Sequence, residues 1–209
     1  MANTSGASID WYFDFVSPYS YICLHRLAEL SSVVAYRPVL FAGLLNHWGQ
    51  KGPAEIPAKR RWTYRWCTWW AEHLGIPFRF PAAHPFNPLP HLRLALAAGP
   101  TTEVVTRIFD SLWTTGRDAS AGFDDLCRDL RVDPARLAFP EIKDALKKAT
   151  ELAASRGVFG VPSFLIEGEV FWGADSIEFV RAFLADPKVL NSAEMRRVDA
   201  LPVAAARKT

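Results

Sequence analysis

The first candidate for chemistry is a serine between two different sequence patterns. Residues 9–16 read IDWYFDFV, an aromatic and β-branched run typical of a strand. Ser17 and Pro18 follow at once, and this pair is typical of the N-cap and first turn of a helix. A serine there lies beside free backbone N–H groups, which stabilise an anion or a thiolate. The residues alone leave two interpretations open: Ser17 activates a nucleophile, or it only caps the helix.

The second candidate is the segment GVFGVPSFLI at 157–166. Gly157 and Gly160 bracket a predicted turn, and Pro162 opens a predicted strand. Most X–Pro bonds in proteins are trans. The pattern by itself therefore predicts an ordinary strand entrance with a trans bond at Val161–Pro162.

A basic segment rich in tryptophan supplies a third candidate. Lys59 stands in PAKRRW and would bind a carboxylate, unless it belongs to a solvated basic face. Aromatic side chains at helical spacing usually mark the buried face of a helix. We therefore predict a core position for the tryptophans that share one face, Trp62, Trp66 and Trp69.

Three further candidates lie in loops. His84 and Asn87 are in the proline-fixed segment HPFNPLP at 84–90, where they would line a substrate pocket. The alternative for Asn87 is that its side chain only completes its own turn. Trp172 would pack at the edge of a site, as a structural residue or as a substrate contact.

The elements that must position these residues follow from the hydrophobic pattern. Strand 9–16, a helix from Pro18 to near Ser31 and a strand Val33–Phe41 form a β–α–β unit with a parallel pair. The chain from 57 to 155 is mostly helical, with helices predicted at 57–74, 90–98, 101–114, 122–130 and 139–155. A hairpin at 161–166 and 169–172 turns at Gly168, and a helix follows at 175–184.

This order predicts an α/β protein in which one sheet is interrupted by helices. The sheet domain would comprise 9–50 and 156–186, and the helical insertion would comprise 51–155. Residues 1–8 and 187–209 are expected to be loosely ordered tails.

Composition excludes several classes of protein. The chain has 209 residues, of which 50% are hydrophobic, and a formal net charge of +2, which argues against disorder and against general binding of nucleic acid or an anionic membrane. It contains no apolar run long enough to span a bilayer. The chain has three cysteines, Cys23, Cys67 and Cys127, an odd number that are far apart in sequence and lack the spacing of metal ligands. This pattern indicates a reducing compartment. We expect a cytoplasmic protein without a metal.

Five segments in this order resemble the thioredoxin-like superfamily, and more specifically the 2-hydroxychromene-2-carboxylate isomerases and the related kappa-class glutathione transferases. They span about residues 9–185 and read FDFVSPYSY, GPAEIPAKRRW, LGIPFRFP, HPFNPLP and GVFGVPSFLIEGEVFWGAD. The resemblance implies a thioredoxin-like βαβ…ββα domain with a large all-helical insertion. Disulfide oxidoreductases of the superfamily carry CxxC at the strand-to-helix turn, where this chain has Ser17-Pro18-Tyr19-Ser20.

The resemblance also implies a glutathione site. Ser17 would be the catalytic residue, whose hydroxyl hydrogen-bonds the glutathione sulfur and favours the thiolate. Val161 and Pro162 match the cis-proline motif that binds the cysteinyl backbone, and Lys59 would contact a carboxylate. Asp175 would hold the γ-glutamyl ammonium. Ser176 would add a hydroxyl, where the relatives have arginine.

The leading functional hypothesis is a glutathione-dependent isomerase of an aromatic-derived carboxylate, acting through reversible thiolate addition. Candidate substrate contacts are Tyr19, His84, Asn87 and Trp172. The alternatives are a kappa-like glutathione transferase and a non-enzymatic glutathione-binding module. The relatives are commonly dimers, so we expect a homodimer.

Overall fold

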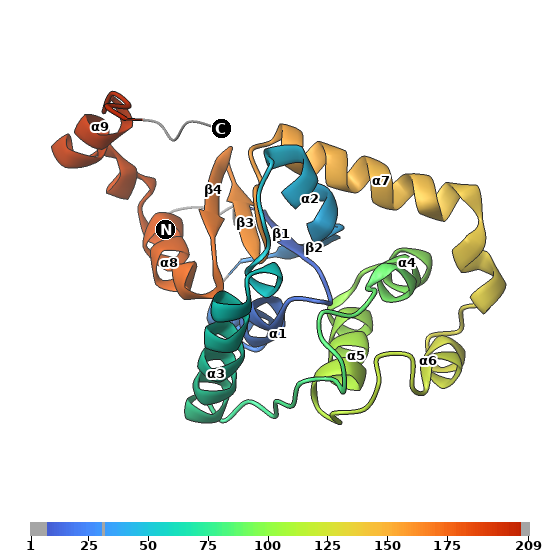
Figure 1. Cartoon of the computed structure of the whole chain (residues 1–209). Helices are drawn as coiled ribbons and strands as arrows, with labels where there is room; N and C mark the ends of the chain where they lie inside the picture. Colours follow the sequence, from blue (N-terminus) through green and yellow to red (C-terminus); the bar gives the residue numbers. More distant parts are fainter. Residues whose placement is uncertain (1–7, 31, 206–209) are drawn as a thin grey trace.

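A mixed four-stranded sheet forms the centre of the computed structural model, which describes residues 8–30 and 32–205 (Figure 1). The strand order is β2-β1-β3-β4. β1 pairs in parallel with β2 and antiparallel with β3, and β3 pairs antiparallel with β4. The bounds are Ile9–Phe13 for β1, Val34–Pro38 for β2, Ser163–Ile166 for β3 and Glu169–Trp172 for β4. The parallel pair and the hairpin expected from the sequence are confirmed. Most of the lead-in, residues 1–7, lies outside the described residues.

The helix that connects β1 to β2 is shorter than predicted. α1 covers Pro18–Leu24 and a 3₁₀ turn covers Leu27–Glu29. The predicted helix end near Ser31 lies outside the described residues. β2 ends before the predicted boundary because Phe41 already begins a helix, α2 (Phe41–Trp48), which the sequence pattern did not indicate.

The helices between the two halves of the sheet match the predicted ranges to within two residues. They are α3 (Pro57–His73), α4 (Leu89–Ala98), α5 (Thr102–Trp113), α6 (Phe123–Asp129) and α7 (Pro140–Ser155). In the view of Figure 1, α4, α5 and α6 lie to the right of the sheet, and the C-terminal helices lie to its left. The region from α3 to α7 is therefore helical, as its periodicity indicates.

The C-terminal part begins with the β3–β4 hairpin. Glu167 and Gly168 make its turn with φ of 53° and 93°, the positive values that a two-residue hairpin turn requires. A 3₁₀ turn at Ala174–Ser176 leads into α8 (Ile177–Ala185). The polar tail contains a further helix, α9 (Ala193–Asp199), which the sequence analysis did not predict. None of the helices in the described ranges is long and apolar enough to cross a membrane.

The core lies on both faces of β1. Trp11 and Phe13 point to one face and join a cluster that includes Phe109 of α5. Tyr12 points to the other face and packs in a second cluster with Leu44 of α2. Since successive side chains of a strand point to opposite faces, a strand buried on both faces reads as a continuous apolar run, as IDWYF does.

The prediction that the α3 tryptophans form core was wrong for two of the three. Trp62 is 65% exposed and Trp69 is 53% exposed. Trp66 is partly buried and lies between them, with ring centroids 6.2 and 5.2 Å away. α3 instead buries the small residues Thr63, Cys67 and Ala71, which allow α3 to lie close to α1. Trp62 and Trp69 instead pack against the ring of Trp66, which itself packs against the buried cluster.

Candidate active site

Ser17 is the N-cap of α1, as the sequence predicts. Its Oγ accepts a hydrogen bond from the backbone N–H of Ser20 at 3.1 Å, and its side chain is almost fully buried. Among the described residues nothing accepts a hydrogen bond from its hydroxyl. The two interpretations of Ser17 are therefore compatible, because a hydroxyl that caps the helix as an acceptor can still donate its own proton.

Two side chains from the helical region hold the loop before Ser17. Trp113 Nε1 donates to the Phe15 carbonyl at 2.9 Å, and His84 Nε2 lies 2.7 Å from the Val16 carbonyl. A carbonyl only accepts, so Nε2 of His84 carries a hydrogen. The other ring nitrogen lies 2.7 Å from the Tyr64 hydroxyl, and burial lowers the His84 pKa. The structure thus brings His84 to the Ser17 loop with both ring nitrogens in contact with other parts of the chain.

A buried carboxylate that the sequence analysis missed completes this loop. Asp14 accepts from the Val16 N–H at 3.0 Å and from the Phe41 N–H, the first of α2, at 2.8 Å. Burial raises its pKa from 3.8 to about 7, against the lowering effect of these backbone donors. The available signal was an acidic residue inside the aromatic run IDWYFDFV, since a charged residue is rarely buried without a function or a partner.

The second motif lies at the same end of the sheet as Ser17. Ser163 pairs with Tyr12, so the residues before β3 are next to the residues after β1. The Val161–Pro162 bond is cis, as the resemblance implied and contrary to the trans bond expected from the residues alone. Pro162 O accepts from Gly173 N at 2.9 Å. In the described part of the chain, the N–H and C=O of Val161 have no hydrogen-bond partner, so they are free to pair with an extended ligand.

Tyr19 and Asp175 lie near each other although 156 positions separate them. Tyr19 is half-buried and packs against the cluster that contains Cys67 of α3. Its pKa is raised to about 12, mainly by burial, and the nearby Cys67 and Asp175 act in the same direction. The 3₁₀ turn that carries Asp175 packs against α1. Asp175 itself is exposed.

Trp172 and Ser176 flank that turn with different contacts. The Ser176 hydroxyl donates to the Gly173 carbonyl at 2.7 Å, so it is already used within the turn. Trp172 is 57% exposed and its ring lies 5.2 Å from that of Phe159. A Cβ placed on Gly160 would be 2.6 Å from Trp172 Nε1, so this glycine allows the indole to lie over the backbone beside Val161.

Two predicted residues have no recorded contact with this group among the described residues. Lys59 is exposed in the first turn of α3 and has no ion-pair partner in the described ranges. The Asn87 side chain accepts from the Leu89 N–H at 3.1 Å, which is the local turn considered as its alternative. Asn87 also lines a cavity of about 900 Å³ that Ser17 does not line.

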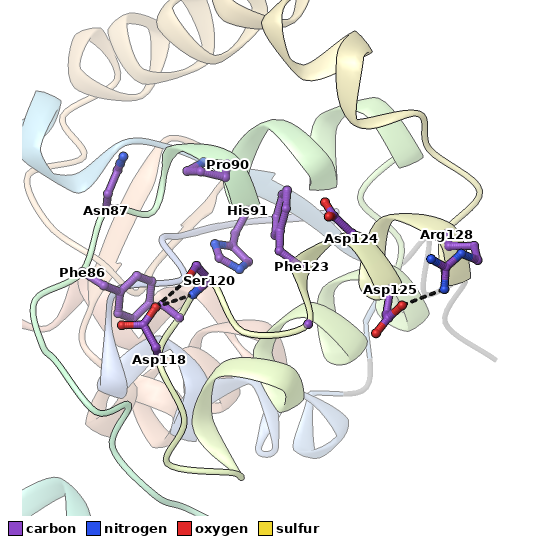
Figure 2. A pocket seen from close by; sticks show the side chains of 12 residues that line it. Phe86, Asn87, Pro90, His91, Asp118, Ser120, Phe123, Asp124, Asp125 and Arg128 are labelled. Carbon is purple, nitrogen blue, oxygen red and sulfur yellow. Dashed lines mark hydrogen bonds and ion pairs between the residues drawn. The ribbon is translucent and has the colours of Figure 1, made fainter.

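Figure 2 shows this cavity. Its carboxylates do not converge: the side chain of Asp118 is bonded to Ser120 at one end, and that of Asp125 is paired with Arg128 at the other. Among residues 8–30 and 32–205 no cluster of three or more His, Cys, Asp or Glu is arranged to hold a metal ion.

The cysteines provide no thiol at the site. All three are free and buried. Burial raises the pKa of the Cys23 thiol far above its ordinary value and that of Cys67 to about 12. A reactive thiolate at the turn would therefore have to come from a bound molecule.

The mixed sheet and the strand-to-helix turn beside a cis-proline define a thioredoxin-like protein. The chain belongs to the family of DsbA-like thioredoxin domains, whose model matches residues 8–185. Among solved structures, a 2-hydroxychromene-2-carboxylate isomerase superposes with a TM-score of 0.75 at 22% identity, covering 93% of this chain and 100% of the other.

Curated relatives are consistent with this placement. The chain is 28% identical over 199 residues to the 2-hydroxychromene-2-carboxylate isomerase of Sphingobium xenophagum, covering 86% of this chain and 98% of the relative. It is also 28% identical over 207 residues to the glutathione S-transferase kappa 2 of Caenorhabditis elegans, covering 86% and 92%. The relatives are thus named as isomerases and as glutathione transferases.

Proposed function

We propose that the protein is a glutathione-dependent isomerase of the 2-hydroxychromene-2-carboxylate type. The observation that carries this proposal is the Ser17 hydroxyl, which caps α1 as an acceptor and keeps its proton to donate. Donation to the glutathione sulfur favours the thiolate over the thiol, because hydrogen bonding to the charged form of an acid lowers its pKa. The chain would supply the donor and glutathione the sulfur.

The rest of the glutathione molecule would extend along the edge beside Ser17. The unpaired N–H and C=O of Val161 would pair with the cysteinyl unit, as an added strand does. Asp175 would receive the γ-glutamyl ammonium. Ser176 would contribute only through its backbone or after breaking its bond to Gly173. Lys59 would bind a carboxylate of glutathione or of the substrate.

The proposed chemistry is a reversible addition. Opening of the substrate ring breaks the C–O bond of the cyclic hemiketal and leaves a phenol and a ketone. The thiolate adds to the alkene carbon β to that ketone, and the electron pair moves to the ketone oxygen as an enolate. Rotation then follows about the carbon–carbon bond that was double before the addition. The enolate then restores the double bond and expels the thiolate. No atom is oxidised or reduced, and the site acts by orientation and by stabilising charge.

Glutathione transfer to an electrophile is the second candidate, because one of the relatives is named a kappa transferase. It uses the same thiolate but ends in a stable C–S bond. The two activities separate in one experiment. The protein is mixed with glutathione and either 2-hydroxychromene-2-carboxylate or a chloronitroaromatic compound. Isomerisation of the carboxylate without a stable conjugate supports the first candidate. A stable conjugate of glutathione with the chloronitroaromatic compound, without isomerisation of the carboxylate, supports the second.

The test of the thiolate proposal compares serine variants. Ser17→Ala should lower isomerase turnover by at least about tenfold and raise the apparent pKa of bound glutathione, followed by thiolate absorbance, since it removes a hydrogen bond to a charged group. Ser17→Thr, which keeps a hydroxyl, should restore most of both. Ser20→Ala is the matched control, because Ser20 Oγ is buried without a partner. Unchanged turnover and thiolate titration in Ser17→Ala would refute the proposed role. Absence of glutathione binding by calorimetry would refute both enzymatic candidates and leave a non-enzymatic module.

A further inference from the structure

A second cavity of about 550 Å³ lies between three helices, and Ser17 does not line it. α7 packs against both α2 and α4, and residues of all three helices line the cavity. Its volume is within the range of small-molecule sites. No residue assigned above to the glutathione site lines it. The lining combines aliphatic side chains, chiefly Leu40, Leu89 and Leu146, with polar ones from all three helices.

The most informative residue of this cavity is Arg93 of α4. Its side chain is partly buried, and its Nε is fully buried with no hydrogen-bond partner. In the described ranges no carboxylate forms an ion pair with its guanidinium. A buried N–H donor without a partner is unfavourable, because it has given up its hydrogen bond to water. An arginine with such a donor on the wall of a cavity is suited to bind an anion there.

The other charges of the cavity favour an anion as well. Lys143 and Lys147 stand one turn apart on α7 and both line it. Among the described residues that line it, Glu151 is the only carboxylate, and its Oε1 lies 3.9 Å from Lys147 Nζ. Three cationic side chains therefore face one carboxylate. Asn46 and His47 of α2 add further polar groups at the opposite wall.

The apolar part of the lining restricts the kind of anion. Leu40, the N-cap of α2, and Leu146 of α7 both line the cavity. Gly43 lets α2 approach α7, since a Cβ there would be 2.9 Å from Thr150 Cγ2. The Thr150 hydroxyl is already used, because it accepts from Leu40 N and donates to Leu146 O. An apolar floor beneath a cationic rim fits an organic anion with a hydrophobic body better than a free inorganic ion.

We propose that the cavity between α2, α4 and α7 binds a small organic carboxylate, with Arg93 as the main anchor and Lys143 and Lys147 as supporting charges. The guanidinium would bind the carboxylate with two parallel hydrogen bonds, and the leucines would cover the hydrophobic body. This site does not depend on glutathione, so its failure and the failure of the proposed function are separate results.

The test uses calorimetry with benzoate, its neutral analogue benzamide, and inorganic phosphate. Benzoate should bind at least about tenfold more tightly than either, because only benzoate offers both a charge for Arg93 and an apolar body. Its affinity should fall as salt is raised. Equal binding of benzamide would refute the role of charge. Equal or tighter binding of phosphate would refute the role of the apolar wall, and no binding of benzoate would refute the site.

Substitutions of the lining residues test whether benzoate binds in this cavity. Arg93→Met keeps most of the side-chain length and should weaken benzoate at least about tenfold, since one charge-assisted pair is lost. Lys143→Met should weaken it less. Arg107→Met is the control, because Arg107 lies on α5, outside the cavity, and is paired with Glu103. Unchanged benzoate affinity in Arg93→Met would overturn the proposal.

A stability measurement distinguishes a ligand anchor from a structural arginine. Without ligand, Arg93→Met should unfold at the same or a higher urea concentration than the wild type, because it removes a buried Nε–H donor that has no partner. With benzoate, only the wild type and Arg107→Met should gain stability. A marked loss of stability in ligand-free Arg93→Met would show that the arginine serves the fold and would contradict the assignment.

Discussion

The buried carboxylate of Asp14 makes the stability of the fold depend on pH in a direction opposite to that of most acidic residues. Burial raises its pKa from 3.8 to about 7. The folded state therefore binds a proton that the unfolded state has already released over this interval. Stability contributed by Asp14 is complete below about pH 4 and is lost as pH rises through about 7.

The size of this effect follows from the shift. A difference of about three pKa units corresponds to about 4 kcal/mol, at 1.36 kcal/mol for each unit. Asp14→Asn removes the titration. It also disturbs one of the two backbone hydrogen bonds, since an amide has one oxygen where the carboxylate has two, at a cost of about 1–3 kcal/mol at every pH.

The assay is urea unfolding of both proteins between about pH 4 and pH 8. The free energy of unfolding of the wild type minus that of Asp14→Asn should fall by about 4 kcal/mol across this range, so the variant should be the more stable protein at the upper end. Asp144→Asn, at an exposed position on α7, makes the same change in charge away from the loop and controls for net charge. A constant difference between wild type and Asp14→Asn would show that Asp14 does not titrate there, and the argument from burial would be refuted.

Two further predictions concern a buried hydrogen bond of this loop and the buried cysteines. Trp113→Phe removes the 2.9 Å hydrogen bond to the buried Phe15 carbonyl and should cost about 1–3 kcal/mol in urea unfolding; an unchanged midpoint would mean that this bond contributes nothing. The cysteines are buried with raised thiol pKa values, so a colourless aromatic disulfide reagent should modify all three only after unfolding. Rapid modification of a native thiol would contradict their described burial.

The helical region and the hairpin could be predicted because their signals are local. The helix α7 begins at Pro140 and keeps an apolar face over sixteen residues, and the hairpin turns at Glu167–Gly168. The helix α2 was missed because its N-cap, Leu40, makes no side-chain cap. The first N–H of α2 is satisfied by Asp14 instead, which lies 27 positions earlier. When a distant residue caps a helix, the sequence around the helix start contains no capping motif.

In the candidate site, too, local features could be predicted from the sequence and long-range contacts could not. Ser17 was predicted from its neighbours, since an N-cap is defined by the next few residues. The contact of His84 with the Val16 carbonyl was not predictable, because it depends on how the helices pack against β1. The tryptophans of α3 show the limit of periodicity: it identifies residues that share a face, but the packing of α1 decides which face is buried.

The three bonds that hold the Ser17 loop have a consequence for how the protein acquires its site. They join residues 27, 68 and 98 positions apart, to α2, to the His84 loop and to α5. Contacts of such long range form late when a chain folds, because loop closure must precede them. A fragment ending after α2 would contain the whole segment FDFVSPYSY yet lack the donors for the Phe15 and Val16 carbonyls. The sequence that bears the serine is therefore not a transferable module, and grafting it onto another sheet would move the residues without the geometry.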